Sequence, residues 1–216
     1  MSRSRARSWR RARQKGAAAS MSALESAHSV AGAVMLGQEE TNWCWAAVTQ
    51  AILHLRNRSK SQEEIVTDHL QAAGRDYTCS GPNRDREDGG HCSPTECTAS
   101  CNDMHSVQIG LAGEGLNVRP ISFSRPPTYS AVEAQIKDQR PVPCHVQWQS
   151  GTAHAVLIVG CSNSGSEKLV QILDPHDASA GQPVSPRPVP HSSLARNYRS
   201  SRTGDIGGVL FAYSVA

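Results

Sequence analysis

A chain of 216 residues, 38% of them apolar, is long enough for one domain of ordinary size and a polar tail. Residues 1–15 carry seven Lys or Arg and no acid, whereas 16–216 carry 15 basic and 19 acidic residues, a net charge of −4. The basic character therefore belongs to an N-terminal arm, and no nucleic-acid partner is expected for the domain. We predict a basic, disordered arm over 1–30 and one domain over 31–216.

The arm lacks the continuous apolar segment of a Sec signal peptide, because Glu25, His28 and several serines interrupt residues 17–37. No stretch approaches the ~20 apolar residues that a membrane span needs. The expected location stays open between the cytoplasm and export by a specialised secretion route. The arm has two further interpretations. One is that the start of the protein is assigned too early and Met21 is the true first residue. The other is that the arm is a pro-segment that is removed.

The first strong structural signal is the stretch from Gln38 to Leu55, whose apolar residues recur at helical spacing. Thr41 or Asn42 is predicted to cap its first turn. Cys44 then lies at the second or third helical position, where unpaired N–H groups and the helix dipole favour a thiolate. We expect a buried helix that presents one cysteine at its solvent-facing end.

Further elements follow from capping boxes and from runs of β-branched residues. Helices are predicted over 61–73, over 94–112, and from Ser130 to about Asp138. A short strand is predicted over 117–123. The runs 142–148, 153–161 and 169–173 predict an antiparallel meander, followed by an irregular loop over 175–205 and a closing strand over 208–215. This order predicts an α+β domain with a helical half, containing the nucleophile helix, and an antiparallel β-sheet half.

Four residues form a candidate site for acyl transfer. Cys44 is the candidate nucleophile and needs a histidine partner, because a free thiol is mostly protonated at neutral pH. His154 opens an apolar strand, and Asp174 ends the next one, so a hairpin between these strands would place the two residues side by side. Gln38 adds a side-chain amide that, with the backbone N–H of Cys44, can form an oxyanion hole.

These residues, in the motifs QEETNWCW, GTAHAVLIVG and ILDP, resemble the papain-like cysteine peptidases. The resemblance is to their compact bacterial branch, which includes type III effector proteases and bacteriocin-leader peptidases, and it covers about 34–174 and the closing strand. It implies the papain-like fold and roles for Gln38 (oxyanion hole), Cys44 (nucleophile), His154 (general base, then acid) and Asp174 (orienting the histidine). Papain has Asn where this chain has Asp174, a variant seen in the bacterial branch.

The resemblance predicts a papain-like endopeptidase that cleaves peptide or isopeptide bonds as a monomer without a cofactor. Its partner would be a protein or peptide substrate. Two alternatives stay open. One is another acyl transfer on the same Cys–His–Asp order, such as transglutaminase-like crosslinking, deamidation or cell-wall amide hydrolysis. The other is an inactive papain-like binding module.

A second cluster of cysteines lies within 23 residues that include a loop rich in Gly, Asp and Arg and the first turns of the helix predicted over 94–112. Its members allow two disulfides, a Zn²⁺ site of Cys₄ or Cys₃His type, or free thiols. Their spacing matches no paired CxxC motif, so a metal site has little support. The cluster consists of Cys79, Cys92, Cys97 and Cys101.

Overall fold

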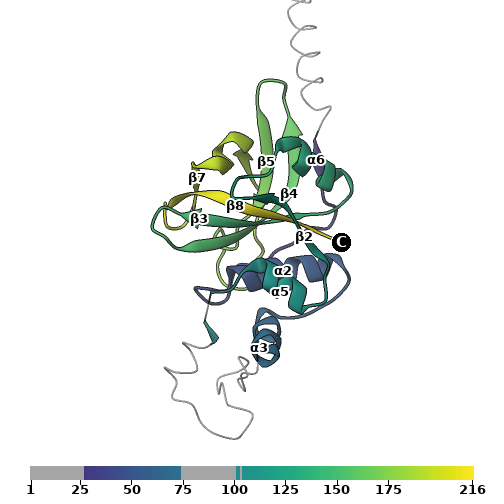
Figure 1. The fold of residues 1–216 in the computed structure, drawn as a ribbon, viewed down its shortest axis with the longest axis vertical. Coiled ribbons are helices and arrows are strands. Elements are labelled where there is room, and N and C mark those ends of the chain that lie inside the picture. Colours follow the sequence, from purple (N-terminus) through teal and green to yellow (C-terminus); the bar gives the residue numbers. More distant parts are fainter. Residues whose placement is uncertain (1–26, 74–100, 103) are drawn as a thin grey trace, which may run out of the picture.

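The computed structural model describes residues 27–73, 101–102 and 104–216, with helix α2 (Cys44–Leu55) against the sheet (Figure 1). Nine of its twelve residues are buried, as its apolar sequence predicts. The predicted cap is wrong, since Trp43 precedes the helix and offers no side-chain cap. Asn42 instead pairs with Asn102, and its side chain donates to the Asn102 carbonyl. Cys44 is therefore the first helical residue.

The remaining helices are shorter than α2. The capping box of Ser61 and Glu64 is confirmed at the start of α3 (Gln62–Ala72). The helix predicted over 94–112 is wrong in part, because residues 104–106 are not helical and Ser106 caps a separate helix, α5 (Val107–Gly113), while Cys101 and residues 107–112 are helical. Helix α6 (Tyr129–Lys137) is capped by Thr128 and not by Ser130. No helix in the described ranges has the length and apolarity to cross a membrane.

An antiparallel sheet forms the second half of the domain, in the order β2-β8-β3-β4-β5-β6, with β1 paired to β4 and β7 to β8. The predicted meander is confirmed. The predicted irregular loop over 175–205 is wrong in part, because it contains β6, β7 and the 3₁₀ helix η1, which pair with or pack on the sheet. Strand β1 falls inside the range predicted as the arm. The strands and η1 are β1 (His28–Ser29), β2 (Val118–Phe123), β3 (Val142–Trp148), β4 (Ala153–Asn163), β5 (Lys168–Leu173), β6 (Arg187–Pro190), η1 (His191–Ala195), β7 (Tyr198–Arg199) and β8 (Ile206–Val215).

Both faces of the sheet are buried, and strand β4 divides the interior into two apolar cores. Ala155, Leu157 and Val159 face a core shared with α2, α3 and α5, whereas Val156 and Ile158 face a core shared with α6. The alternation follows from the two-residue period of a strand. In Figure 1, α2, α3 and α5 lie on one side of the sheet and α6 on the other. The structure is thus α+β, and the helix carrying Cys44 packs on the strand carrying His154.

Gly110 sets how closely α5 approaches α2, and its replacement tests this packing. A Cβ at Gly110 would lie 2.8 Å from Trp45 Cε3 and 2.9 Å from Thr49 Oγ1, both on α2. We expect Gly110→Ala to lower the free energy of unfolding by about 1–3 kcal/mol, measured by urea denaturation. Gly113→Ala on the same helix is the matched control, because no heavy atom of the described residues lies within 4 Å of the place its Cβ would occupy. Equal effects of the two changes would contradict this packing role.

Candidate active site

Cys44 lies at the start of α2, at the point where the helix meets the sheet. It is a free thiol, 6% exposed, and it lines a cavity of about 180 Å³ together with His154. Two contacts hold the chain that leads into the helix: Trp43 Nε1 donates to the Cys101 carbonyl over 2.7 Å, and Asn42 pairs with Asn102. The sulfur is therefore presented by a rigid, buried segment with a small opening beside it.

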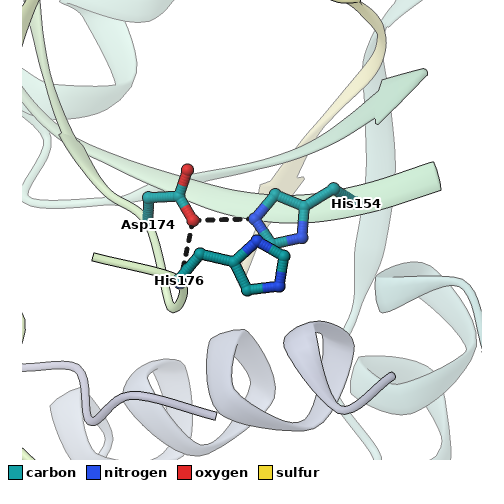
Figure 2. Close-up of side chains that lie close together, drawn as sticks. All are labelled: His154, Asp174 and His176. Carbon is teal, nitrogen blue, oxygen red and sulfur yellow. Dashed lines mark hydrogen bonds and ion pairs between the residues drawn. The ribbon is translucent and has the colours of Figure 1, made fainter. Parts of the chain in front are cut away.

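His154 and Asp174 come together as their positions in the hairpin predict. Strands β4 and β5 are antiparallel, with Leu157 opposite Leu173, so the start of β4 lies beside the residue that follows β5. His154 Nε2 donates to Asp174 Oδ1 over 2.7 Å, as Figure 2 shows. Both side chains are buried, His154 at 3% exposure and Asp174 at 0%. Such a bond fixes which ring nitrogen carries the proton toward the carboxylate.

The Cys44 thiol lies beside the same imidazole. Cys44 and His154 line one cavity and interact electrostatically. Since Nε2 is occupied by Asp174, Nδ1 is the ring nitrogen that is left for the thiol. The structure thus brings Cys44, His154 and Asp174 together where the start of α2 meets the end of β5.

The charges of His154 and Asp174 stabilise each other. Burial by itself lowers the pKa of His154, but the charges of Asp174 and Cys44 and the hydrogen bond to Asp174 outweigh burial and raise the pKa to about 10. Burial raises the pKa of Asp174, but the His154 charge and the hydrogen bonds to this carboxyl hold the pKa well below its usual range. At neutral pH the pair is therefore an imidazolium and a carboxylate.

His176, two residues beyond Asp174, covers this pair from one side. Its ring is stacked on the His154 ring, with centroids 4.2 Å apart and planes inclined by 20°. Its backbone N–H donates to Asp174 Oδ1 over 3.0 Å (Figure 2). Burial, followed by the positive charge of His154, lowers the pKa of His176 to about 4, so this ring is neutral at neutral pH. Sequence reasoning missed His176, although its place two residues after Asp174 is visible in the sequence.

The same three residues also satisfy a distance criterion for a metal site. His154, Asp174 and His176 each place one potential ligand atom within 4.8 Å of the other two. However, nearly parallel stacked rings do not aim their in-plane lone pairs at one ion, and Asp174 Oδ1 already accepts two hydrogen bonds. The geometry favours a hydrogen-bonded pair over a metal centre at these residues.

Gln38 lies on the His176 side of the site, because its backbone N–H donates to the Pro175 carbonyl over 3.2 Å. Gln38 and His176 both line a hollow of about 880 Å³. The amide Nε2 donates to the carbonyls of Glu40 and Thr41, each over 2.7 Å, and Oε1 is buried with no hydrogen-bond partner among the described residues. Donation to a substrate oxygen therefore requires Gln38 to exchange one of these bonds.

Of the second cysteine cluster, Cys101 belongs to the described residues and is disulfide-bonded. This state excludes Cys101 as a free thiol or as a zinc ligand in this structure, and it favours disulfides over the other two states predicted for the cluster. Cys79, Cys92 and Cys97 lie outside the described residues. Because the Cys101 carbonyl accepts the bond from Trp43, the disulfide is anchored beside the start of α2.

Solved structures resemble the chain at low sequence identity. One, titled "Structural basis for the limited antibody cross reactivity between the mite allergens Blo t 1 and Der p 1", is 14% identical with a TM-score of 0.44, over 89% of this chain and 71% of that one. Another is digestive procathepsin L 3 of Tenebrio molitor larval midgut, 10% identical with a TM-score of 0.37, over 86% and 70%. Both scores are too low to add to the assignment.

The family of the chain is shown by its match to a protein-family model. No curated protein matches the chain. The sequence model of the family described as papain-like cysteine protease AvrRpt2 matches residues 27–184, well over half of the chain, and this range includes Gln38, Cys44, His154 and Asp174. The chain belongs to this family of papain-like cysteine proteases.

Proposed function

We propose that this chain is an endopeptidase that hydrolyses peptide or isopeptide bonds through Cys44, His154 and Asp174, with Gln38 in the oxyanion hole. The observation that carries the proposal is that one buried imidazole donates to Asp174 through Nε2 and lines the same cavity as the Cys44 thiol. Family membership favours hydrolysis by a cysteine protease over transfer to another amine.

Before the proposed reaction begins, His154 already carries the proton on Nδ1, so a Cys44 thiolate lies beside an imidazolium. The thiolate attacks the scissile carbonyl and forms a tetrahedral intermediate with a negative oxygen. His154 then gives its Nδ1 proton to the leaving amine, the C–N bond breaks, and a thioester remains on Cys44. Water, deprotonated by His154, attacks the thioester and releases the acid. Asp174 keeps the ring oriented throughout and does not itself lose or gain the proton.

Gln38 is proposed to stabilise the negative oxygen together with the backbone N–H of Cys44. Its amide lies at the edge of the larger hollow, where it donates to the Glu40 and Thr41 carbonyls. When a substrate oxygen becomes negative, it is a stronger acceptor than a neutral carbonyl, so exchange of one bond is favourable at that stage.

Two hollows at the site support cleavage within a chain. The cavity of about 180 Å³ is lined by Cys44 and His154, and the hollow of about 880 Å³ is lined by Gln38 and His176. Because His176 stacks on His154, the two hollows flank the imidazole. A peptide with residues on both sides of the scissile bond can therefore occupy both, which is the requirement of an endopeptidase.

The test is the reaction of the thiols with an epoxide that alkylates cysteine thiolates, followed against pH by mass spectrometry of the peptides. In the wild type, we expect Cys44 to be labelled rapidly well below pH 8, because His154 stabilises the thiolate. In His154→Ala, we expect labelling at neutral pH to be at least about tenfold slower. Cys161, a buried free thiol, provides the internal reference. Slow labelling of Cys44 in the wild type, with an ordinary titration near pH 8–9, would contradict the proposal.

A further inference from the structure

Asp174 has a second buried partner, which the sequence did not suggest. Tyr198, on β7, donates its hydroxyl to Asp174 Oδ2 over 2.7 Å, and its side chain is 0% exposed. Asp174 Oδ1 accepts from His154 Nε2 over 2.7 Å. The two carboxylate oxygens are therefore held by different groups, and a turn of the carboxylate toward His154 or away from it would break the bond to Tyr198.

The hydroxyl of Tyr198 is itself oriented. Arg187 Nη2, from β6, donates to this hydroxyl oxygen over 3.1 Å, and the guanidinium carbon lies 5.3 Å from the centroid of the Tyr198 ring. Arg187 is fixed in turn by Asp177, to which Nε donates over 3.2 Å. Since the oxygen accepts from Arg187, its hydrogen is directed to Asp174. Burial, with the Asp174 charge beside it, raises the pKa of Tyr198, so the hydroxyl keeps this hydrogen.

The rings around the pair restrict movement further. Trp148 is stacked with Tyr198, with centroids 5.8 Å apart and planes inclined by 16°, and with His154, at 5.6 Å and 24°. Trp148 thus contacts both Tyr198, which donates to Asp174 Oδ2, and His154, which donates to Asp174 Oδ1. The ring of Tyr198 cannot move without disturbing this packing.

We propose that Tyr198 is a positioning residue, which orients the Asp174 carboxylate toward His154 and is itself aligned by Arg187. The proposal rests on the proposed function of Cys44 and His154 and deepens it. Tyr198 and Arg187 both lie beyond residues 27–184, the range that the family model matches. The segment after β5 therefore supplies the support of the catalytic pair and is more than a connection between strands.

Apart from Tyr198, the charged and titratable groups that face Asp174 and His154 come from four parts of the chain. In Tyr198→Phe all of them remain, but Oδ2 loses its hydroxyl donor and keeps only the longer ion pair with Arg187 Nη2, at 3.9 Å, so the carboxylate turns more easily about its Cβ–Cγ bond. The bond to His154 is then weaker, so the imidazolium is less stable and loses its proton at lower pH. The groups that face Asp174 and His154 directly are Cys44 at the start of α2, His145 on β3, His176 after β5 and Arg187 on β6. Behind them, Asp177 lies against Arg187, and Arg202 and Asp205 interact with His176.

Two measurements on Tyr198→Phe test the proposal. The first is the rate of epoxide labelling of Cys44 against pH, which we expect to fall about tenfold at neutral pH, with its alkaline limit at lower pH than in the wild type. The second is an NMR titration of the His154 ring in Cys44→Ala and in Cys44→Ala/Tyr198→Phe. We expect the pKa of His154 to be lower in the second protein. This titration does not depend on a reactive thiol.

Tyr129→Phe is the matched control, because Tyr129 is another buried tyrosine of the same core and touches neither Asp174 nor His154 among the described contacts. Arg187→Met is the second variant, and we expect a smaller change in the same direction. If Tyr198→Phe and Tyr129→Phe lose stability alike and neither changes the labelling profile or the His154 titration, Tyr198 is a packing residue and the proposal is overturned.

Different outcomes would contradict the proposed protease function and the proposed positioning role of Tyr198. If wild-type Cys44 is labelled slowly but the His154 titration shifts in Cys44→Ala/Tyr198→Phe, the proposed protease function is wrong while the positioning role stands. If wild-type Cys44 is labelled rapidly and Tyr198→Phe behaves like the wild type in both measurements, the positioning role is wrong while the protease function stands.

Discussion

Cys44→Ala is expected to abolish peptide hydrolysis, with kcat lowered by about 10⁴-fold or more against a library of quenched fluorescent peptides. The reason is that no other described free thiol lies near His154: Cys144 is fully buried on β3, with its pKa raised by burial, and Cys161 lies in the core on the α6 side of the sheet. In the proposed mechanism, the imidazole and the oxyanion hole without the nucleophile retain only a small part of the rate enhancement.

Cys161→Ala is the control for this change, since it removes a buried free thiol from the same protein without touching the candidate site. We expect it to keep the wild-type turnover. Both variants are compared at equal folded fraction, determined from their thermal unfolding. Full activity in Cys44→Ala would exclude this residue as the nucleophile.

The second large effect is expected at Asp174, where two substitutions separate orientation from charge. Asp174→Ala removes the acceptor of the His154 Nε2–H bond and the partner of Tyr198, so we expect kcat/KM to fall about 10²–10³-fold. Asp174→Asn keeps an oxygen that can accept from Nε2, so the ring stays oriented and the loss is smaller.

The contribution of the Asp174 charge is measured from the pH dependence of kcat/KM. The pKa of His154 is raised to about 10 largely by the charge of Asp174, so the imidazolium persists until the pH approaches that value. In Asp174→Asn the negative charge is gone, and the imidazolium is lost at lower pH. The alkaline limb of the kcat/KM profile therefore moves down in pH. Asp138→Asn, an exposed carboxylate at the end of α6, is expected to leave the profile unchanged. An unshifted limb in Asp174→Asn would contradict the assigned role.

Much of the fold was predictable because its signals are local. The apolar periodicity of residues 44–55, the capping box of Ser61 and Glu64, and the β-branched runs of β3 to β5 each depend on a few neighbouring residues. The sequence prediction was wrong where a residue distant in the sequence binds the expected capping residue, or where another residue caps the helix. Asn42 pairs with Asn102 and does not cap α2, and Ser106 starts a separate helix at the position where a longer one was predicted.

The contact of His154 with Asp174 was also predictable, because a hairpin brings the start of one strand beside the end of the next. The residues that hold this pair in place were not predictable from the sequence. His176 reaches the His154 ring only because the chain turns back after Asp174, and Tyr198 reaches Asp174 only because β7 pairs with β8. A tyrosine in a stretch rich in Pro, Ser and Arg carries no local signal of such a role.

The sequence by itself therefore determined the helix that bears Cys44, the strand that bears His154, the strand that Asp174 follows, and the type of chemistry these residues allow. Only the tertiary structure decided how the Asp174 carboxylate is oriented and protected from water. The physical reason is that a hydrogen bond between buried groups depends on distance and direction across the sheet, and residues 24 positions apart, such as Asp174 and Tyr198, meet only when the strands between them have paired.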